Sequence, residues 1–379
     1  MNLEDYQSGY YKQQYEYQSF CPTPINHPWV ITDTRVQRLL SDADRLLGEL
    51  NAFSQLVPDV DFFIRMHITK EATQSSRIEG TRTNIEEALL GEQDIEPEKR
   101  GDWEEVQNHI QSINLSIKQL NEIPLSNRLL RNAHRTLMQG VRGETKQPGE
   151  FRISQNWIGV SLGNAMFVPP HWEEVPDLMG DLEQFIHNDH MNVPHLVRIA
   201  IAHYQFETVH PFLDGNGRLG RLMIALYLAN FGLLEKPSLY LSDFFERNKT
   251  DYISHLMAVR EGNKMSEWIL FFLHGVQETA TNSIRVFKNI LLLKSEIESK
   301  HLPHFTNRRQ ANAQALLNHL YQVPLVSVKG VAKLLDVQIN TASALINDFK
   351  KHGILVEITG NQRNRLFGFR DYIQIFKDT

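Results

Sequence analysis

Twelve consecutive residues of the 379-residue chain, 210–221, combine groups that suit a phosphate ligand, and they read H-P-F-L-D-G-N-G-R-L-G-R. Glycines on both sides of Asn216 let successive backbone N–H groups turn into a concave, anion-binding loop. A helix is expected to begin near Arg218, and its N-terminus would add positive partial charge to that loop. Arg218 and Arg221 are three residues apart, on one side of the first helical turn, and both are permanently charged. The stretch therefore predicts an anion site.

The same stretch carries groups for a reaction as well as for binding. Asp214 offers the hard carboxylate oxygen that Mg²⁺ prefers beside phosphates. His210 is of the residue type that titrates near neutral pH, so it can act as a general base. No Gly-Lys-Ser/Thr sequence follows, so the stretch is not a Walker A loop. An ordinary glycine-rich loop is the alternative, but the combination of base, acid, anion loop and two arginines argues against it.

Helices must position this stretch from both sides. The segments 194–208 and 218–231 leave no polar face, and helices that are apolar all round lie in the middle of a core. The stretch is therefore expected to begin and end deep in the protein. Helical spacing of apolar residues predicts further helices from the Asp33 N-cap to Leu50, from Asp59 or Asp61 to Ser76, and near 101–121, 126–139, 173–188, 249–260 and 265–299.

Two segments break the helical pattern. Residues 1–28 hold five tyrosines within the first 17 positions, which predicts an irregular, extended arm that packs on the body through its aromatic side chains. Binding of a partner is the alternative for this arm. Residues 150–170 hold two short apolar runs around a Gly163-Asn164 turn, which predicts a β-hairpin. A lone hairpin in a helical protein has no sheet to join, so its edge would be free.

The C-terminal region has a different pattern and a different charge. The pattern predicts three helices and then two strands around a Gly360-Asn361 turn, over 310–320, 327–335, 340–352, 354–359 and 365–369. A helix-turn-helix followed by a hairpin is typical of a winged-helix domain. Residues 301–379 carry ten Lys/Arg and five Asp/Glu, whereas the rest of the chain is acidic, and this difference indicates two kinds of partner.

The whole 210–221 stretch resembles the signature of the Fic family, H-x-F-x-D/E-G-N-G-R-x-x-R, at every defined position. Residues 151–159, F-R-I-S-Q-N-W-I-G, are similar to the first strand of that family's flap hairpin. Residues 239–268 are similar to its closing helices, and Ser75 to Gly80 fit its inhibitory pattern, S/T-x-x-x-E-G/N. The resemblance implies a mainly α fold, in which a Fic-type helical bundle carries a β-hairpin flap and the predicted winged-helix domain follows.

The resemblance implies a protein adenylyltransferase, which moves AMP from ATP to a Ser, Thr or Tyr hydroxyl of a target protein and of itself. His210 would deprotonate the hydroxyl, and Asp214 would hold Mg²⁺ against the α- and β-phosphates. Arg218 would neutralise the departing pyrophosphate, and Arg221 would grip the γ-phosphate. Tyr252 is similar to the first of a tyrosine pair in the family's adenine pocket, although an isoleucine takes the second place here. The implied nucleotide-binding residues are Asn156, Trp157, Ile158, Gly159, Gly215, Asn216, Gly217, Arg218, Leu219, Gly220, Arg221 and Tyr252.

The resemblance also implies an inhibitory motif and a strand edge to which the target protein binds. Ser75, Glu79 and Gly80 would form the inhibitory motif, in which Glu79 pairs with Arg221 in place of the γ-phosphate. Residues 156–159 would cover the nucleotide, and the free edge of the flap would bind the target protein as an added strand. A simple lid is the alternative role for this hairpin.

These features divide the chain into an N-terminal arm and helices with the inhibitory motif, a Fic core, a connecting helix and a winged-helix domain, at 1–95, 96–280, 281–300 and 301–379. Two other functions stay open. The winged helix could make the protein a DNA-binding regulator, or it could serve as a protein contact. Glu79 could instead position water to remove AMP from a target. An intact His210 and both arginines favour AMP transfer, and the third C-terminal helix offers no arginine for guanine contacts.

Composition excludes several classes of protein. With 41% hydrophobic and 22% charged residues, the chain is neither disordered nor fibrous. No apolar run reaches the length of about 18 residues that a membrane helix needs, so no membrane partner is expected. The single cysteine, Cys21, excludes an internal disulfide and a multi-cysteine zinc site, and residues 1–9 do not resemble a secretory signal, so a cytoplasmic location is expected. His187, His190 and His195 lack the spacing of a zinc hydrolase. A homodimer stays open.

Overall fold

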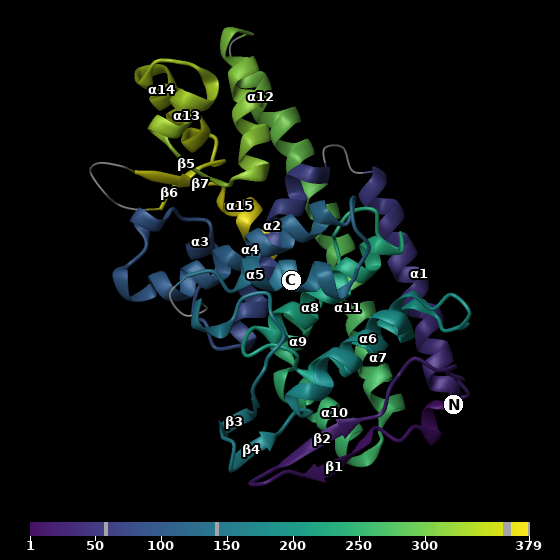
Figure 1. The fold of residues 1–379 in the computed structure, drawn as a ribbon. Helices are drawn as coiled ribbons and strands as arrows, with labels where there is room; N and C mark the ends of the chain where they lie inside the picture. Colours follow the sequence, from purple (N-terminus) through teal and green to yellow (C-terminus); the bar gives the residue numbers. More distant parts are fainter. Residues whose placement is uncertain (57–59, 141–143, 306, 359–364, 378–379) are drawn as a thin grey trace.

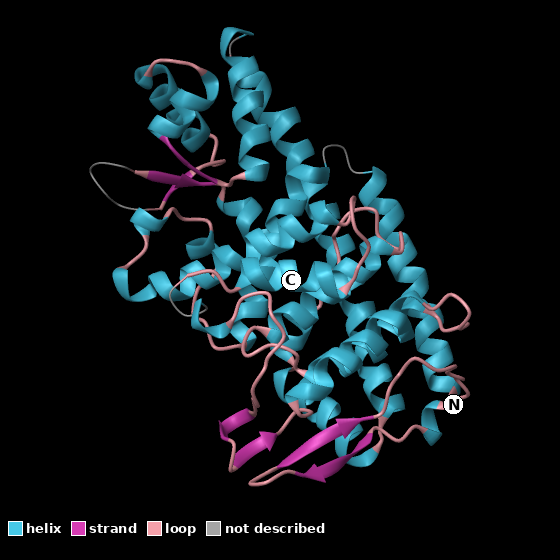
Figure 2. Ribbon diagram, in the orientation of Figure 1, coloured by secondary structure: helices cyan, strands magenta, loops and turns pink. Residues whose placement is uncertain are grey.

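The computed structural model describes residues 1–379 apart from 57–59, 141–143, 306, 359–364 and 378–379. Helices dominate the described part, together with three small antiparallel sheets (Figures 1 and 2). The α-helices are α1 (Thr34–Leu56), α2 (Val60–Ile78), α3 (Ile85–Ala88), α4 (Arg100–Gln119), α5 (Asn127–Leu137), α6 (Val175–His187), α7 (His195–Val209), α8 (Asn216–Asn230), α9 (Ser242–Arg247), α10 (Lys249–Gly262), α11 (Met265–Glu296), α12 (Asn307–Gln322), α13 (Val328–Leu335), α14 (Ile339–Lys351) and α15 (Arg370–Lys377).

The strands and short helical turns connect these helices. The strands are β1 (Gly9–Gln13), β2 (Gln18–Pro22), β3 (Ile158–Ser161), β4 (Asn164–Phe167), β5 (Leu325–Ser327), β6 (Val356–Glu357) and β7 (Leu366–Gly368). The short turns, 3₁₀ except for the π-helical η6, are η1 (Leu3–Asp5), η2 (Glu92–Asp94), η3 (Pro97–Lys99), η4 (Glu144–Lys146), η5 (Trp172–Glu174), η6 (Ile297–His301) and η7 (Leu302–His304).

The two helices predicted to be apolar all round are α7 and α8, and both lie in the core (Figure 1). Every residue of α7 from Leu196 to Val209 is buried, as is every residue of α8 from Arg218 to Leu228. The long helix α11 packs against α7 and α1. The stretch 210–221 therefore starts and ends inside the protein, as predicted.

Helix α2 lies between the core and the C-terminal region. It packs against α4, α9 and α12. Near its start, the ring of Phe63 lies 5.3 Å from that of Tyr321 and 6.4 Å from that of Tyr372, measured between centroids. At its other end it contacts α8. One straight element thus reaches from the C-terminal region to residues 210–221.

The N-terminal arm is a hairpin, so the prediction of an irregular arm is wrong. β1 and β2 pair antiparallel, with Tyr10 opposite Cys21. Tyr6 and Phe20 are buried, as expected for an arm that packs through aromatic side chains, but Tyr10, Tyr11 and Tyr15 are exposed. β1 is exposed at four successive positions, whereas β2 is buried at four, so neither strand shows the alternation of buried and exposed residues that marks a half-buried strand.

The predicted second hairpin is present as β3 and β4, with Ile158 opposite Phe167 and an irregular register after it. Its two strands form a sheet of their own, and the hairpin lies beside β1–β2 (Figure 2). Phe20 N–H donates a hydrogen bond to the Val168 carbonyl (3.0 Å), which ties the base of this hairpin to the N-terminal one.

The C-terminal region holds a small sheet of order β5–β7–β6 together with α12, α13 and α14. This arrangement is compatible with a winged helix, which stays a prediction. The N-cap of α14 is Gln338 rather than Asn340, and the Gly360-Asn361 turn lies outside the described residues. Helix α15 was not predicted, because eight residues with three buried positions give too short a pattern, and it folds back onto α2 and α11.

Two further observations bear on the predicted organisation. Helix α11 runs without a break across position 280, so that predicted boundary falls inside a helix, and the four-part division stays a prediction. Within the part of the chain that the structure describes, no helix is long and apolar enough to cross a membrane.

Candidate active site

The loop between α7 and α8 is held by side chains from the segment that leads into the flap hairpin. Arg152 is buried and donates from Nε to the His210 carbonyl (3.0 Å). Asn156 donates from Nδ2 to the carbonyls of His210 (3.2 Å) and Phe212 (2.9 Å). These bonds satisfy buried carbonyls that would otherwise be unpaired. They also support the left-handed backbone of His210, whose φ is 49°.

The His210 ring is uncharged. Its Nδ1 atom is buried and has no hydrogen-bond partner among the described residues. Burial, helped by the positive charges of Arg260 and Arg152, lowers the pKa of His210 to about 4. The imidazole is therefore neutral at pH 7, which is the state that a general base requires.

The N-terminus of α8 is built as an anion site from backbone groups. The side chain of Asn216 accepts from Phe212 N–H (2.8 Å) and donates to the Phe212 carbonyl (2.8 Å), so it closes the loop. Gly215 takes a left-handed conformation (φ 76°), and Met138 Sδ would leave no room for a Cβ there. The backbone N–H groups of Asn216 and Gly217 stand in the first turn of α8, where a helix offers them no internal acceptor.

A buried histidine that the sequence did not single out fixes Asp214. His134 accepts from Gly149 N–H at Nδ1 (2.8 Å), so its hydrogen is on Nε2, which donates to the Asp214 carbonyl (2.9 Å). The His134 ring stacks on Phe212 with centroids 3.9 Å apart. His134 therefore sets the backbone of the loop at the predicted metal ligand.

Ser75 and Glu79 both contact Arg221. The Arg221 guanidinium donates from Nε to Ser75 Oγ (3.0 Å), and from Nη2 to the Ser75 carbonyl (2.9 Å) and to Glu79 Oε1 (2.8 Å). Burial, the largest single influence, would raise the pKa of Glu79, but the charge and hydrogen bond of Arg221, together with smaller contributions of Arg218 and His210, outweigh it and lower that pKa. A Cβ at Gly217 would collide with Glu79 Oε1. The Glu79 carboxylate thus lies over the first turn of α8, where a phosphate is expected.

Arg221 is enclosed while Glu79 is partly open to solvent: their side chains are 2% and 40% exposed. Gly80 follows with φ 105°, a left-handed value that favours glycine where the chain leaves α2. All three residues of the predicted inhibitory motif therefore lie at the site.

Arg218 also has a carboxylate partner, one that the sequence did not indicate. Its Nη1 atom lies 3.2 Å from Oε2 of Glu105 on α4. Arg218, Glu105, Glu79 and Asp214 line one open cavity of about 590 Å³. Asp214 uses Oδ1 to accept Gly215 N–H (2.6 Å), and this is the one hydrogen bond that its carboxylate makes among the described residues.

These residues fit a magnesium–phosphate complex. Mg²⁺ is usually held by one or two carboxylates together with water and substrate phosphates. Among the described residues no group of three or more His, Cys, Asp or Glu side chains is arranged to hold a metal alone. Asp214 at the cavity wall would be the protein ligand, and the nucleotide would supply the others.

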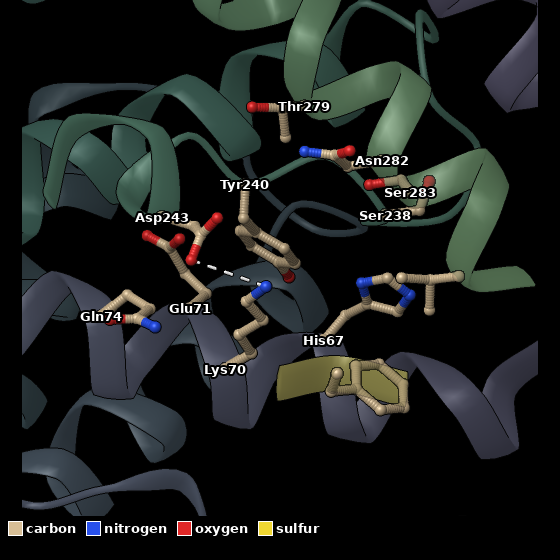
Figure 3. A pocket seen from close by; sticks show the side chains of 12 residues that line it. His67, Lys70, Glu71, Gln74, Ser238, Tyr240, Asp243, Thr279, Asn282 and Ser283 are labelled. Atoms are coloured by element: carbon tan, nitrogen blue, oxygen red, sulfur yellow. Dashed lines mark ion pairs between the residues drawn. The ribbon is translucent and has the colours of Figure 1, made fainter. Parts of the chain in front are cut away.

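Figure 3 shows a second, smaller cavity of about 40 Å³ along α2, one to three turns before Glu79. Lys70 pairs with Asp243 across it (3.5 Å), and Ser242 Oγ–H donates to Glu71 Oε1 (2.5 Å). Burial raises the pKa of Glu71 to about 7. These contacts tie α2 to α9 and so fix the position from which Glu79 reaches Arg221.

Tyr252 and the flap residues are placed differently from the phosphate loop. The Tyr252 hydroxyl lies 2.9 Å from His203 Nε2, in an aromatic cluster where its ring stacks on Phe245. Tyr252 is buried, and its hydroxyl lies close enough to Arg221 for the two side chains to interact. Trp157 is half exposed, and Gly159 has φ 133°, where a Cβ would press on the opposite strand. Ile158, Leu219 and Gly220 supply backbone and packing rather than charge. A nucleotide contact by Tyr252 or by the flap residues stays a prediction.

Known proteins are similar to parts of this chain. Residues 37–118 match the family model described as "Fic/DOC family N-terminal", and residues 124–228 match the one described as "Fic/DOC family". "Protein adenylyltransferase Fic" of Drosophila ananassae is 35% identical over 152 residues, which are 40% of this chain and 27% of that protein. The protein of the same name from Drosophila erecta is 31% identical over 152 residues, 40% of this chain and 28% of its own. The chain thus spans less than a third of the length of these relatives.

Two solved structures share the fold. A Fic family protein from Desulfovibrio desulfuricans G20 aligns with a TM-score of 0.56 and 20% identity, over 90% of this chain and 98% of that one. A Fic domain containing signaling protein from Bacteroides thetaiotaomicron VPI-5482 aligns with a TM-score of 0.51 and 20% identity, over 67% and 97%. At this identity they show the fold alone.

With its helical Fic fold and its two matching segments, the chain is a Fic/DOC family protein. Within that family it is a distant relative of the protein adenylyltransferases named Fic.

Proposed function

We propose that the protein transfers AMP from ATP to a Ser, Thr or Tyr hydroxyl of a target protein, and to itself. One observation carries this proposal. The anion site at the N-terminus of α8 is filled by the chain's own carboxylate, Glu79, which lies on Arg221. In the same loop, His210 is neutral and has an unpartnered Nδ1 atom. A site that attracts an anion next to a ready base suits phosphoryl chemistry.

In the proposed reaction the target hydroxyl oxygen attacks the α-phosphorus of ATP. A new O–P bond forms, the bond to the β-phosphate oxygen breaks, and pyrophosphate leaves. His210 takes the hydroxyl proton, while the N–H groups of Asn216 and Gly217 and the guanidinium of Arg218 face the phosphates. A Mg²⁺ ion at Asp214 would neutralise phosphate charge.

The second part of the proposal is autoinhibition by Glu79. Arg221 is the residue expected to hold the γ-phosphate, and its enclosed guanidinium already makes a charge-assisted bond to the Glu79 carboxylate, which competes with that phosphate. While Glu79 lies on Arg221, the γ-phosphate would meet a negative charge instead of a positive one. ATP would then bind with its phosphates out of line for attack.

The third part concerns protein targets, for which we propose the flap hairpin as the docking edge. β3 and β4 form a two-stranded sheet, so each strand has an unpaired side. Val160 is 87% exposed, and Ile153 and Met166 are also exposed. Exposed apolar side chains along a free strand edge suit the addition of an extended segment from another protein.

For the C-terminal region we propose a protein contact rather than DNA binding. Four of its basic side chains pair with two acidic ones, in Arg309–Asp348, Lys351–Asp348, Lys350–Glu357 and Arg365–Glu357. Such pairs leave less positive charge for DNA phosphates. A gel shift with duplex DNA over a range of salt concentrations tests this, and tight, salt-dependent binding would contradict it.

Incubation of the protein with α-labelled and, separately, with γ-labelled ATP tests the main proposal. We expect protein-bound label from the α position only. Label from the γ position would instead indicate a kinase. No label from either position, with the Glu79→Gly variant as well as the natural chain, would contradict the proposal.

Removal of AMP is the second candidate function, because the Glu79 side chain is 40% exposed and water can reach its carboxylate. Loss of label from a pre-modified protein on addition of this chain, absent with Glu79→Gly, would favour that candidate.

A further inference from the structure

Glu105 forms with Arg218 a second arginine–carboxylate pair in the phosphate site. The side chain of Arg218 is 6% exposed and that of Glu105 is 20% exposed, so the pair is mostly shielded from water. Arg218 has no other carboxylate partner in the described part of the chain, and its Nε atom is buried without an acceptor. Its Nη2 atom lies 3.9 Å from Met138 Sδ.

The two arginines of the loop are therefore neutralised from two directions. Glu79 comes from α2 and contacts Arg221, while Glu105 comes from α4 and contacts Arg218. The helices belong to different segments, so the two contacts are separable by mutation. The contact of Glu105 removes one positive charge from a cavity whose wall also holds Glu104, Asp214 and the basic side chain of Arg100.

The charge of Glu105 affects how strongly Arg218 binds a phosphate of the nucleotide. A phosphate that approaches Arg218 must share the guanidinium with a carboxylate that already occupies one of its donors. Two anions on one cation repel each other, and the repulsion is stronger in a shielded site than in water. The carboxylate of Glu105 therefore weakens the hold of Arg218 on a phosphate.

We propose that Glu105 is a positioning residue that acts through Arg218 and sets how strongly the β-phosphate of the nucleotide is held. This inference rests on the proposed function, in which Arg218 faces the departing pyrophosphate. According to this proposal, the two carboxylates weaken the binding of different phosphates of the nucleotide. Glu105 affects any nucleotide with a β-phosphate, whereas Glu79 affects only one with a γ-phosphate.

A series of AMP, ADP and ATP, titrated into the full chain with Mg²⁺ by calorimetry, tests this directly. For Glu105→Gln we expect ADP and ATP to bind about five- to tenfold more tightly and AMP to bind as before. Glu79→Gly should tighten ATP alone. Glu122→Gln is the control, because Glu122 is an exposed carboxylate just after the end of α4 and does not line the cavity. It should leave all three affinities within about twofold.

Two further variants exclude a merely structural effect. Glu105→Asp keeps the charge and should stay near the natural affinities. In an Arg218→Gln background, Glu105→Gln should no longer change ADP binding, because the residue through which it acts is gone. Unchanged or weaker ADP binding by Glu105→Gln would overturn the inference, as would an equal gain from Glu122→Gln.

This outcome is independent of AMP transfer. A chain that binds the series as expected but transfers no label would contradict the proposed function and leave the role of Glu105 standing. A chain that transfers AMP but shows no β-phosphate-dependent gain would contradict the role of Glu105 alone.

Discussion

Oε1 of Glu79 lies 2.8 Å from Nη2 of Arg221, over the first turn of α8. These residues are 142 positions apart in sequence and come from different helices. Their pairing puts a negative charge of the protein where a phosphate would bind. The first prediction concerns the removal of this charge.

Glu79→Gly should raise AMP transfer, including self-modification, by about tenfold or more, because about 1.4 kcal/mol of recovered transition-state binding is tenfold in rate. Label transfer from α-labelled ATP measures it. Adding Arg221→Ala should abolish the gain, since the γ-phosphate then has no anchor. If Glu79→Gly lowers transfer instead, the carboxylate is catalytic or structural and the inhibitory role is wrongly assigned.

His210→Ala should reduce AMP transfer by about 10²–10⁴-fold, the usual contribution of a general base. ATP affinity should change little, because the loop N–H groups that face the phosphates are backbone. The measurement compares label transfer with nucleotide titration in the Glu79→Gly background, where activity is highest. Transfer at the unmutated rate would remove His210 from the mechanism.

The pH dependence of kcat/KM should show the lowered pKa of His210. A base works only when unprotonated, so the rate falls as pH drops below the pKa of the free enzyme. With that pKa at about 4, kcat/KM at pH 5 should be close to its value at pH 7. An ordinary histidine, with a pKa of about 6.5, would lose roughly 30-fold at pH 5. A half-maximal rate near pH 6.5 would show that the ring is not desolvated as described.

Arg152→Lys should destabilise the protein by about 1–3 kcal/mol and slow AMP transfer, because a lysine cannot reach the carbonyls that the guanidinium caps. The affected acceptors include the carbonyl of His210 itself. Thermal unfolding and label transfer measure the two effects. Arg128→Lys, on the exposed side of α5, is the matched control and should change neither. Equal behaviour of the two variants would show that Arg152 does not support the loop.

Glu207→Gln should change how stability depends on pH. Burial raises the pKa of Glu207 to about 7, and its Oε1 atom has no partner among the described residues. The folded state therefore favours the protonated acid, so this contribution is complete below about pH 4.5 and is lost as pH rises through about 7. The neutral amide should remove part of the fall in Tm between pH 5 and 8. Glu16→Gln, at an exposed position, should leave the pH profile unchanged.

The parts of the site that could be predicted are those formed by residues close together in the sequence. The loop 210–221 carries its glycines, its asparagine and its arginines at fixed spacings, and the apolar runs around it mark α7 and α8. The pattern from Ser75 to Gly80 is equally compact.

The parts that could not be predicted depend on contacts between distant elements. Glu105 sits in an ordinary amphipathic helix, and nothing in its neighbours indicates that Arg218 lies 3.2 Å away. Arg152 and His134 support the loop by capping its carbonyls, a role that any buried polar residue could have. β1 was missed because it is exposed along most of its length, so its residues do not alternate between apolar and polar.

The contact of Phe63 with Tyr321 and Tyr372 has a consequence for how the chain folds. Phe63 meets these rings only after about 260 to 310 intervening residues have found their places. Contacts of such sequence separation close large loops, and they form late and slowly. Until then the apolar start of α2 lacks its cover, even if the core around α7 and α8 has already collapsed. The helix that carries Glu79 is therefore expected to be among the last elements to pack into its final position. In a newly folding chain, Arg221 would then be accessible before Glu79 pairs with it.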